Sequence, residues 1–266
     1  MRIFFWTNLF AIFLPSAFGT APLVYQNDFN TPASLTGFTF GPVASGQPAT
    51  SIEVSSGQLR IVVGDGLQNG GYAALNTSAY AAPYAAILSN NPGLVTWAFN
   101  VSNQDGLYNN AFAFALASTS PDARIYTSST DYFGGGGYVG NRMALWRQVG
   151  PAQGSPSLQP IIDITNGLGI LPQKGSFRIT YDPPTSRWEL YGTMGTSYAD
   201  PLAVTTLLGS AVDNRLTGIA LPYTSVIGTS TGSDYFDNLT VTVLPEPSTA
   251  LLAVLGILAF AASRRR

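Results

Sequence analysis

Short runs of β-branched and aromatic residues recur along the middle of the chain, separated by clusters of Gly, Pro, Asn and Ser. No stretch between residues 20 and 243 keeps the apolar spacing of an amphipathic helix. This pattern is typical of an all-β sandwich or barrel. We expect strands at Leu23–Phe29, Gln58–Val63, Leu94–Val101, Ala111–Ala117, Arg142–Gln148, Ser176–Tyr181, Arg187–Tyr191, Thr217–Leu221 and Tyr235–Val243.

The clearest local pattern is the segment SFRITYDPPTSRWELYGT, which begins at Ser176. Apolar residues alternate with polar ones on both sides of the turn residues Asp182 to Ser186. Alternation with a period of two residues predicts a hairpin that buries one face. The segments SSGQLRIVV and DYFDNLTVTV show the same alternation. Since we find neither an internal repeat nor a linker, we expect one domain over residues 20–243.

The first 19 residues have the three parts of a signal peptide. Arg2 gives the positive start, Ile3 to Leu14 the apolar stretch, and Ala17 and Gly19 the small residues before the cut. We expect signal peptidase to cleave after Gly19. An apolar run of about 12 residues is shorter than the roughly 20 that span a bilayer as a helix, which argues against an uncleaved anchor.

The C-terminus combines the sequence LPEPS, an apolar run and the cluster Arg264, Arg265 and Arg266. We expect a transmembrane segment over residues 248–262. The positive-inside rule then places the arginines in the cytoplasm and the body outside. Pro245 and Pro247 keep the chain before this segment extended, as a processing enzyme requires.

The tail LPEPSTALLAVLGILAFAASRRR resembles the PEP-CTERM sorting signal. Its motif is Pro245-Glu246-Pro247, with Leu244 where the family most often has Val. The resemblance implies recognition by an exosortase, which cleaves near the motif, in Gram-negative bacteria that make exopolysaccharide. The tail would anchor the protein in the inner membrane before processing. The mature protein would then lie at the cell surface or in the extracellular matrix.

Composition excludes several classes of chemistry. The chain has no Cys and no His, so disulfides, thiolate and imidazole metal sites and nucleophile–histidine dyads are ruled out. The body has thirteen acidic and eight basic residues between Thr20 and Leu244, which makes it a poor electrostatic partner for nucleic acid or for anionic lipid. Its two Glu residues, Glu53 and Glu189, are far apart in sequence and form no catalytic carboxylate pair motif. We therefore expect a protein that is not an enzyme.

The glycine run GGGGYVG contains the spacing of a dinucleotide-binding motif. That motif needs a strand before it and a helix after it. No helical pattern follows, so we interpret the run as a loop or hairpin tip.

The body carries YQNDF near its start, then GQLRIV, RITYDP and a last strand with Asp-Asn. In this order the motifs resemble concanavalin A-like (laminin-G-like) jelly rolls. The resemblance implies a single jelly-roll β-sandwich whose first and last strands are antiparallel neighbours. Asn27, Asp28, Asp237 and Asn238, with Asp234, would then converge as oxygen ligands for Ca²⁺. The alternative is that Asp237 and Asn238 only satisfy backbone groups of a turn.

Four tyrosines lie in Gly- and Asn-rich segments and are candidates for an exposed sugar-stacking surface. They are Tyr72, Tyr108, Tyr132 and Tyr138. The sequence thus predicts an exported, non-enzymatic structural or adhesive protein of the cell surface or exopolysaccharide matrix, as in a biofilm. It needs no cofactor, Ca²⁺ being the one candidate. The alternative is a carbohydrate-binding module that recognises extracellular polysaccharide.

Overall fold

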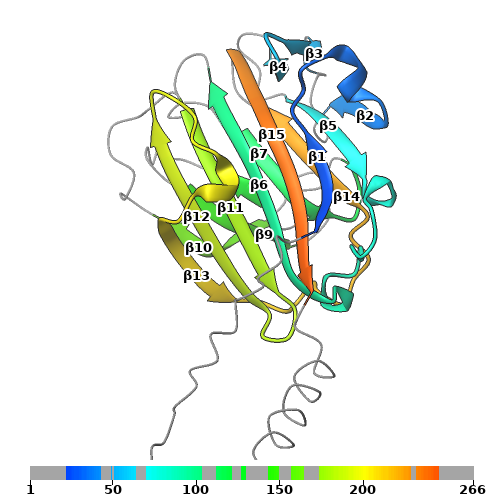
Figure 1. Ribbon diagram of the computed structural model, residues 1–266, viewed down its shortest axis with the longest axis vertical. Coiled ribbons are helices and arrows are strands. Elements are labelled where there is room, and N and C mark those ends of the chain that lie inside the picture. The colour runs from blue at the N-terminus through cyan, green and yellow to red at the C-terminus, as the bar shows by residue number, and fades with distance from the viewer. Residues whose placement is uncertain are drawn as a thin grey trace, which may run out of the picture.

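The fold is a sandwich of two antiparallel sheets, seen in a computed structural model (Figure 1). The structure describes residues 22–42, 49, 51–63, 70–103, 112–121, 127–129, 143–149, 157–164, 174–228 and 232–245. These residues form strands and four 3-10 helices of three or four residues each, and none of them lies in an α-helix. The all-β prediction is confirmed for this part of the chain.

The predicted signal helix (residues 1–19) and transmembrane segment (248–262) lie outside the described residues. Among the residues that are described, no helix has the length and apolar character needed to cross a membrane.

Sheet A has eight strands, and β1 pairs with β15 beside the main order β13-β12-β11-β6-β15-β4-β3. The strands are β1 (Leu23–Asn27), β3 (Ser51–Ser55), β4 (Gln58–Val63), β6 (Gly93–Asn103), β11 (Lys174–Asp182), β12 (Arg187–Gly195), β13 (Leu207–Val212) and β15 (Gly232–Pro245).

Sheet B has seven strands in the order β10-β9-β8-β7-β14-β5-β2. They are β2 (Phe38–Pro42), β5 (Gly71–Asn76), β7 (Phe112–Ser118), β8 (Thr127–Ser129), β9 (Met143–Val149), β10 (Ser157–Ile164) and β14 (Tyr223–Gly228). The 3-10 helices are η1 (Pro32–Leu35), η2 (Thr77–Ala79), η3 (Leu88–Asn90) and η4 (Pro201–Ala203).

Strand β15 occupies the middle of sheet A and is the longest strand, with 14 residues. One of its edges pairs with β6 along most of its length. The other edge is shared by β4, which pairs with residues 232–236, and β1, which pairs with residues 239–242. The predicted antiparallel pairing of the first and last strands is therefore confirmed. The ends of β1 and β15 that meet the termini lie at one end of the sandwich, which we call the lower end (Figure 1).

The core between the sheets is built on aromatic side chains. Phe99 of β6 and Phe114 of β7 meet across the sandwich with their ring centroids 4.5 Å apart. Trp97 and Trp188 stack at 5.9 Å, and Tyr181 packs on Trp188 at 4.6 Å. All of these rings are fully buried. In a chain without cysteine, such burial is the main source of stability.

The alternating segments form the predicted hairpins. Phe177, Ile179, Trp188 and Leu190 are buried on the inner face of the β11–β12 hairpin. In the β3–β4 hairpin, Ser56 and Gly57 have φ values of 53° and 75°. Two successive positive φ angles are typical of the tight turn whose twist matches the strands.

The predicted strand Thr217–Leu221 is wrong. The segment turns on itself, since the Thr217 N–H donates to the Asn214 carbonyl and the Ile219 N–H donates to the Leu216 carbonyl. The strand begins only after Pro222, as β14. Leu221 alone among the apolar residues of the segment is buried, and Ile219 is exposed, so the apolar pattern does not mark a strand here.

A buried ion pair joins the two sheets. Arg147 of β9 contacts Asp213, which follows β13, and both side chains are at most 5% exposed. Arg147 also donates to Gln159 at 2.6 Å, and the Asp213 carboxylate accepts the Arg215 N–H at 3.2 Å. Each charge thus has further hydrogen bonds, which a buried pair needs to offset its loss of water.

We predict that replacing Asp213 by Ala lowers the free energy of unfolding by about 3–5 kcal/mol, because it leaves a buried arginine without its counter-charge. Urea unfolding of the full chain in detergent measures the loss. The control is Glu53→Ala at the Arg60–Glu53 pair, where Glu53 is 48% exposed. That change costs about 0–1 kcal/mol. Equal losses in the two variants would contradict the prediction.

Candidate functional site

The β1–β15 pairing brings Asn27 and Asp28 close to Asp237 and Asn238, whereas Asp234 is buried further along β15, where it pairs with Ile61 of β4. Asn27 pairs with Leu239, and the residues next to them are Asp28 and Asn238. Asn238 has a φ of 51° within a bulge of β15, and its N–H donates to the Asp237 carboxylate at 2.7 Å. Burial raises the pKa of Asp237, and the charge of Asp28 raises it further, while hydrogen bonds from Asn238 and Gln58 lower it.

The Asn27 side chain makes three hydrogen bonds around the turn that follows β1. Its amide oxygen accepts the Phe29 N–H at 2.9 Å, and its NH₂ group donates to the Ser34 carbonyl at 2.7 Å and to the Tyr25 hydroxyl at 3.1 Å. The side chain therefore closes the turn after β1. Within the described part of the chain, no three acidic side chains are grouped to hold a metal ion. A Ca²⁺ ion at Asp28 and Asp237 would need backbone or water oxygens as well, and it stays a prediction.

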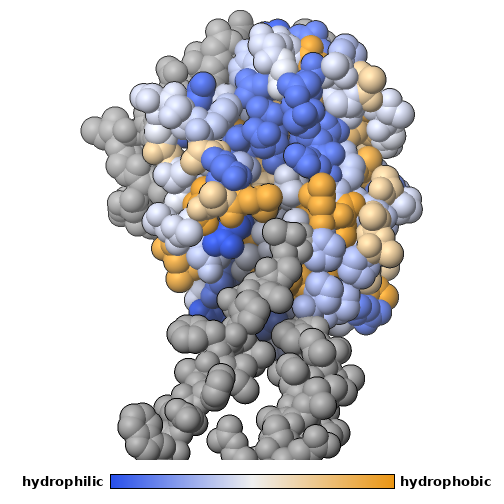
Figure 2. All heavy atoms as spheres, in the orientation of Figure 1, coloured by the Kyte–Doolittle hydropathy of each residue, from blue (hydrophilic) through white to orange (hydrophobic). Residues whose placement is uncertain are grey.

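Beside these carboxylates, a row of polar and aromatic side chains crosses the outer face of sheet A. The strand registers place Arg60 of β4 next to Tyr235 of β15, Tyr235 next to Ser102 of β6, and Ser102 next to Lys174 of β11. Arg60 also pairs with Glu53 of β3 at 3.1 Å. Hydrophilic residues gather over the upper part of this face (Figure 2).

Tyr198 covers this row from the connection between β12 and β13. Its hydroxyl donates to Ser102 at 2.8 Å and accepts from the Gln58 amide at 2.9 Å. The Lys174 ammonium lies 4.9 Å from the centre of its ring. Burial raises the pKa of Tyr198, against the effect of its hydrogen bonds to Ser102 and Gln58. The hydroxyl therefore acts as a neutral hydrogen-bonding group. We call Gln58, Arg60, Ser102, Lys174, Tyr198, Tyr235 and Asp237 the upper surface.

The connection that carries Tyr198, residues 196–206, runs as a strap over the outer face of sheet A. Ser176 of β11 holds it by accepting the Ala199 N–H at 3.0 Å and donating to the Ala199 carbonyl at 3.2 Å. Arg178 donates to the Val204 carbonyl at 3.0 Å. The strap fixes the position of Tyr198 although it contains no strand.

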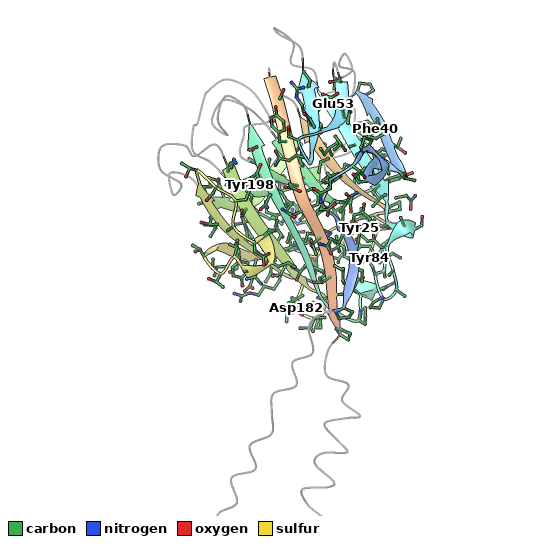
Figure 3. The ribbon with its side chains drawn as sticks, turned by 45° about the horizontal axis from the view of Figure 1, so that its top comes forward. Tyr25, Phe40, Glu53, Tyr84, Asp182 and Tyr198 are labelled. Carbon is green, nitrogen blue, oxygen red and sulfur yellow. The ribbon has the colours of Figure 1, made fainter. Side chains whose placement is uncertain are left out.

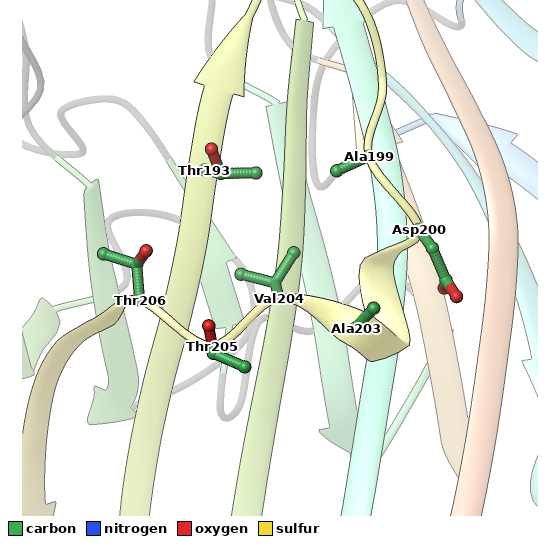
Figure 4. A pocket seen from close by; sticks show the side chains of 7 residues that line it. All are labelled: Thr193, Ala199, Asp200, Ala203, Val204, Thr205 and Thr206. Atoms are coloured by element: carbon green, nitrogen blue, oxygen red, sulfur yellow. The ribbon is translucent and has the colours of Figure 1, made fainter.

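A pocket of about 230 Å³ opens beside the strap (Figure 4). Its lining consists of small side chains and one carboxylate: Thr193, Ala199, Asp200, Ala203, Val204, Thr205 and Thr206. Asp200 accepts the Leu202 N–H at 3.0 Å and so begins η4. The pocket brings together no acid–base pair, and nothing in its lining points to a particular ligand.

Of the four candidate sugar-stacking tyrosines, the structure describes one, and that one does not lie on the upper surface. Tyr72 lies on β5 of sheet B, where it packs against Ala115 and Ile227. Tyr108, Tyr132 and Tyr138 lie outside the described residues. The aromatic residues of the upper surface, Tyr198 and Tyr235, were not predicted. Tyr235 had a signal in the alternation of DYFDN, whereas Tyr198 lies in an irregular connection that has none.

Glu53 and Glu189 lie toward opposite edges of sheet A, on β3 and β12. Figure 3 shows Glu53 at the upper end of the molecule and Asp182 at the lower end. Glu189 pairs with Arg187 at 3.0 Å and accepts the Tyr191 hydroxyl at 2.6 Å. Each carboxylate thus serves a separate ion pair on the sheet.

Solved structures similar to this chain include a lectin and a CBM2 module. Lectin I from Ulex europaeus, in complex with the methyl glycoside of α-L-fucose, is 15% identical, with 84% of this chain and 98% of that chain covered and a TM-score of 0.50. The CBM2 module of the Lactobacillus casei BL23 phage J-1 evolved Dit is 9% identical, with 85% and 97% covered and a TM-score of 0.52. At these identities the likeness shows the fold alone. The body is a concanavalin A-like jelly roll.

A second similarity concerns the C-terminal tail. Residues 243–266 match the PEP-CTERM protein-sorting motif. A search among curated proteins finds no match for this chain. The sorting motif implies an exported protein. Of its predicted residues, Pro245 is the exposed last residue of β15, and Glu246, Pro247 and Arg264 to Arg266 lie outside the described residues.

We predict that replacing Asp237 by Asn raises the melting temperature at neutral pH in the presence of chelator. The pKa of Asp237 is raised in the folded state. The protonated form of Asp237 is therefore favoured in the folded state. The stability that Asp237 contributes is complete below the ordinary Asp pKa, and it is lost as the pH rises through the raised pKa. Asn carries no charge and avoids this loss.

If Ca²⁺ binds at Asp28 and Asp237, millimolar Ca²⁺ raises the melting temperature of the natural chain and leaves Asp237→Asn unchanged. Glu53→Gln, which removes an exposed carboxylate elsewhere, keeps the Ca²⁺ effect. A natural chain that melts at the same temperature in chelator and in Ca²⁺ would refute the metal site.

Proposed function

We propose that this protein is an exported, non-enzymatic component of the cell surface or exopolysaccharide matrix of a Gram-negative bacterium. An exosortase sorts it through the C-terminal tail, and the jelly roll acts as the structural or adhesive body. One observation carries the proposal: the sorting motif begins at residue 243, inside the last strand of the sandwich. The folded body and the sorting motif are therefore joined without a linker.

The end of β15 is part of the folded sheet. Val243 is fully buried, and Leu244 and Pro245 pair with Leu94 and Gly93 of β6. The Val243 N–H donates to the Pro22 carbonyl, three residues after the predicted signal cleavage. Both processing events would take place at the lower end, where the folded body limits access to the chain.

We predict that locking the end of β15 blocks processing of the tail, because the processing enzyme binds an extended segment that is free of other partners. The natural chain has no cysteine, so Leu94→Cys with Leu244→Cys provides the only disulfide. In an exosortase-bearing host, this variant keeps its tail, and a reductant restores processing. Mass spectrometry of the exported protein measures both states.

The matched control is Thr96→Cys with Thr242→Cys, which joins the same two strands two residues further from the motif. It forms a disulfide in the same oxidising compartment and leaves the end of β15 able to separate. If both locked variants are processed as fast as the natural chain, the end of β15 does not take part in recognition.

The second candidate function is carbohydrate binding, with the upper surface as its site. It combines two half-buried tyrosines with an amide, a carboxylate and two cations, the types of group that bind the faces and hydroxyls of sugars. Many of these groups already hold each other in place, as in the hydrogen bonds of Tyr198. A surface fixed in this way binds with little loss of side-chain freedom.

We predict that Tyr235→Ala weakens the binding of the full chain to the host's own polysaccharide roughly fivefold, since one stacking contact contributes about 1 kcal/mol. Phe40→Ala is the control, because Phe40 is a 44% exposed aromatic residue at the edge of sheet B. Affinity electrophoresis in polysaccharide gels compares the two. Equal binding by both variants would remove the upper surface from the proposal, and release of sugar products would overturn the non-enzymatic function.

A further inference from the structure

Exposed aliphatic side chains gather at the lower end of the sandwich. The described residues include seven large hydrophobic side chains that are exposed, and four of them lie at this end. They are Leu23 (52% exposed), Val212 (71%), Ile219 (43%) and Leu244 (38%). Single exposed apolar residues need no explanation, but a group at one end marks an interaction surface.

Strand pairing places Leu23 and Leu244 together. Leu23 begins β1 and pairs with Thr242, two residues before Leu244 in β15. Leu244 in turn pairs with Leu94, at the start of β6. Both side chains therefore lie where the described chain begins and ends.

Val212 and Ile219 reach the same end from the other strands. Val212 ends β13 and pairs with Arg187, the first residue of β12 after the lower hairpin turn. Ile219 precedes Ala220, which bridges to Ile87 in the segment that leads into β6. In Figure 1, β13 and β15 both finish at the lower end.

The described charges at this end are of both signs. Arg187 is exposed and pairs with Glu189 at 3.0 Å, and Asp182 lies nearby at the lower end (Figure 3). Arg215 is exposed, whereas Asp213 is buried in its ion pair with Arg147. Aliphatic side chains beside exposed arginines are typical of proteins that lie on the headgroup region of a bilayer.

The tail places a bilayer close to this end. The apolar run starts at Thr249, four residues after Pro245. A fully extended chain covers at most about 3.5 Å per residue, so the run begins within about 14 Å of the end of β15. Whatever the conformation of these residues, a membrane that holds the apolar run lies next to the lower end.

We propose that, before the tail is removed, the lower end rests on the membrane surface. Leu23, Val212, Ile219 and Leu244 enter the interfacial region, and Arg215 lies at the level of the headgroups. The upper surface then points away from the membrane. This inference rests on the proposed function, in which the tail is a membrane anchor.

Single-cysteine variants test the contact, because the natural chain has no cysteine of its own. Val212→Cys and Ile219→Cys report on the lower end. Leu202→Cys, on the strap, replaces an equally apolar residue that is 42% exposed, and Ser56→Cys lies in the β3–β4 turn. Each full-length chain, with its tail intact, carries an environment-sensitive fluorophore. The chains are reconstituted into vesicles of phosphatidylethanolamine and phosphatidylglycerol, and melting temperatures confirm that each variant is folded.

We expect the fluorophores at positions 212 and 219 to show blue-shifted emission and loss of signal when headgroup-spin-labelled lipid is included. Those at 202 and 56 keep the emission they have in buffer. Flotation of the vesicles shows separately whether the tail anchors the chain. If the chain floats but positions 212 and 219 behave like 202 and 56, the membrane contact is refuted and the tail anchor stands. If the chain does not float, the anchor and the contact are both refuted.

Discussion

The pairing of β15 with three other strands is the contact on which the rest of the structure depends. β15 connects β6 on one edge with β4 and β1 on the other, so it joins the beginning, middle and end of the chain in one sheet. It also sends Phe236, Leu239 and Val241 into the core. Since these partners are far apart in sequence, the sheet forms only when large loops close.

This pairing also decides where the sorting motif leaves the folded body. Because β1 and β15 are antiparallel, both ends of the body leave the sandwich at the lower end. The sorting motif continues directly from β15, and exposed aliphatic residues surround that point. The polar upper surface lies toward the other end of the same sheet, where it is furthest from the tail. One strand therefore connects the sorting motif with the candidate binding surface.

On the outer face of sheet A, the strap holds polar side chains in fixed positions. The strap is held by Ser176 and Arg178 and places Tyr198 over Ser102 and Gln58. On the same face, the carboxylates of Asp28 and Asp237 lie close enough to repel each other. This repulsion destabilises the folded state unless a proton or a cation balances the two charges. The repulsion between Asp28 and Asp237 is the strongest physical reason to test for a bound cation beside the upper surface.

The sequence alone determined the C-terminal sorting motif, the all-β class and the strands with clear alternation, such as β4, β11, β12 and β15. These are local properties, because side chains that alternate in or out need only their own strand. Strands such as β5, with the sequence GYAALN, lack this contrast and were not predicted. The tertiary structure decided the Arg147–Asp213 pair, whose partners are 66 residues apart, and the position of Tyr198 on an irregular strap. Contacts of this kind depend on which segments the closed sheets bring together, and no local pattern records that.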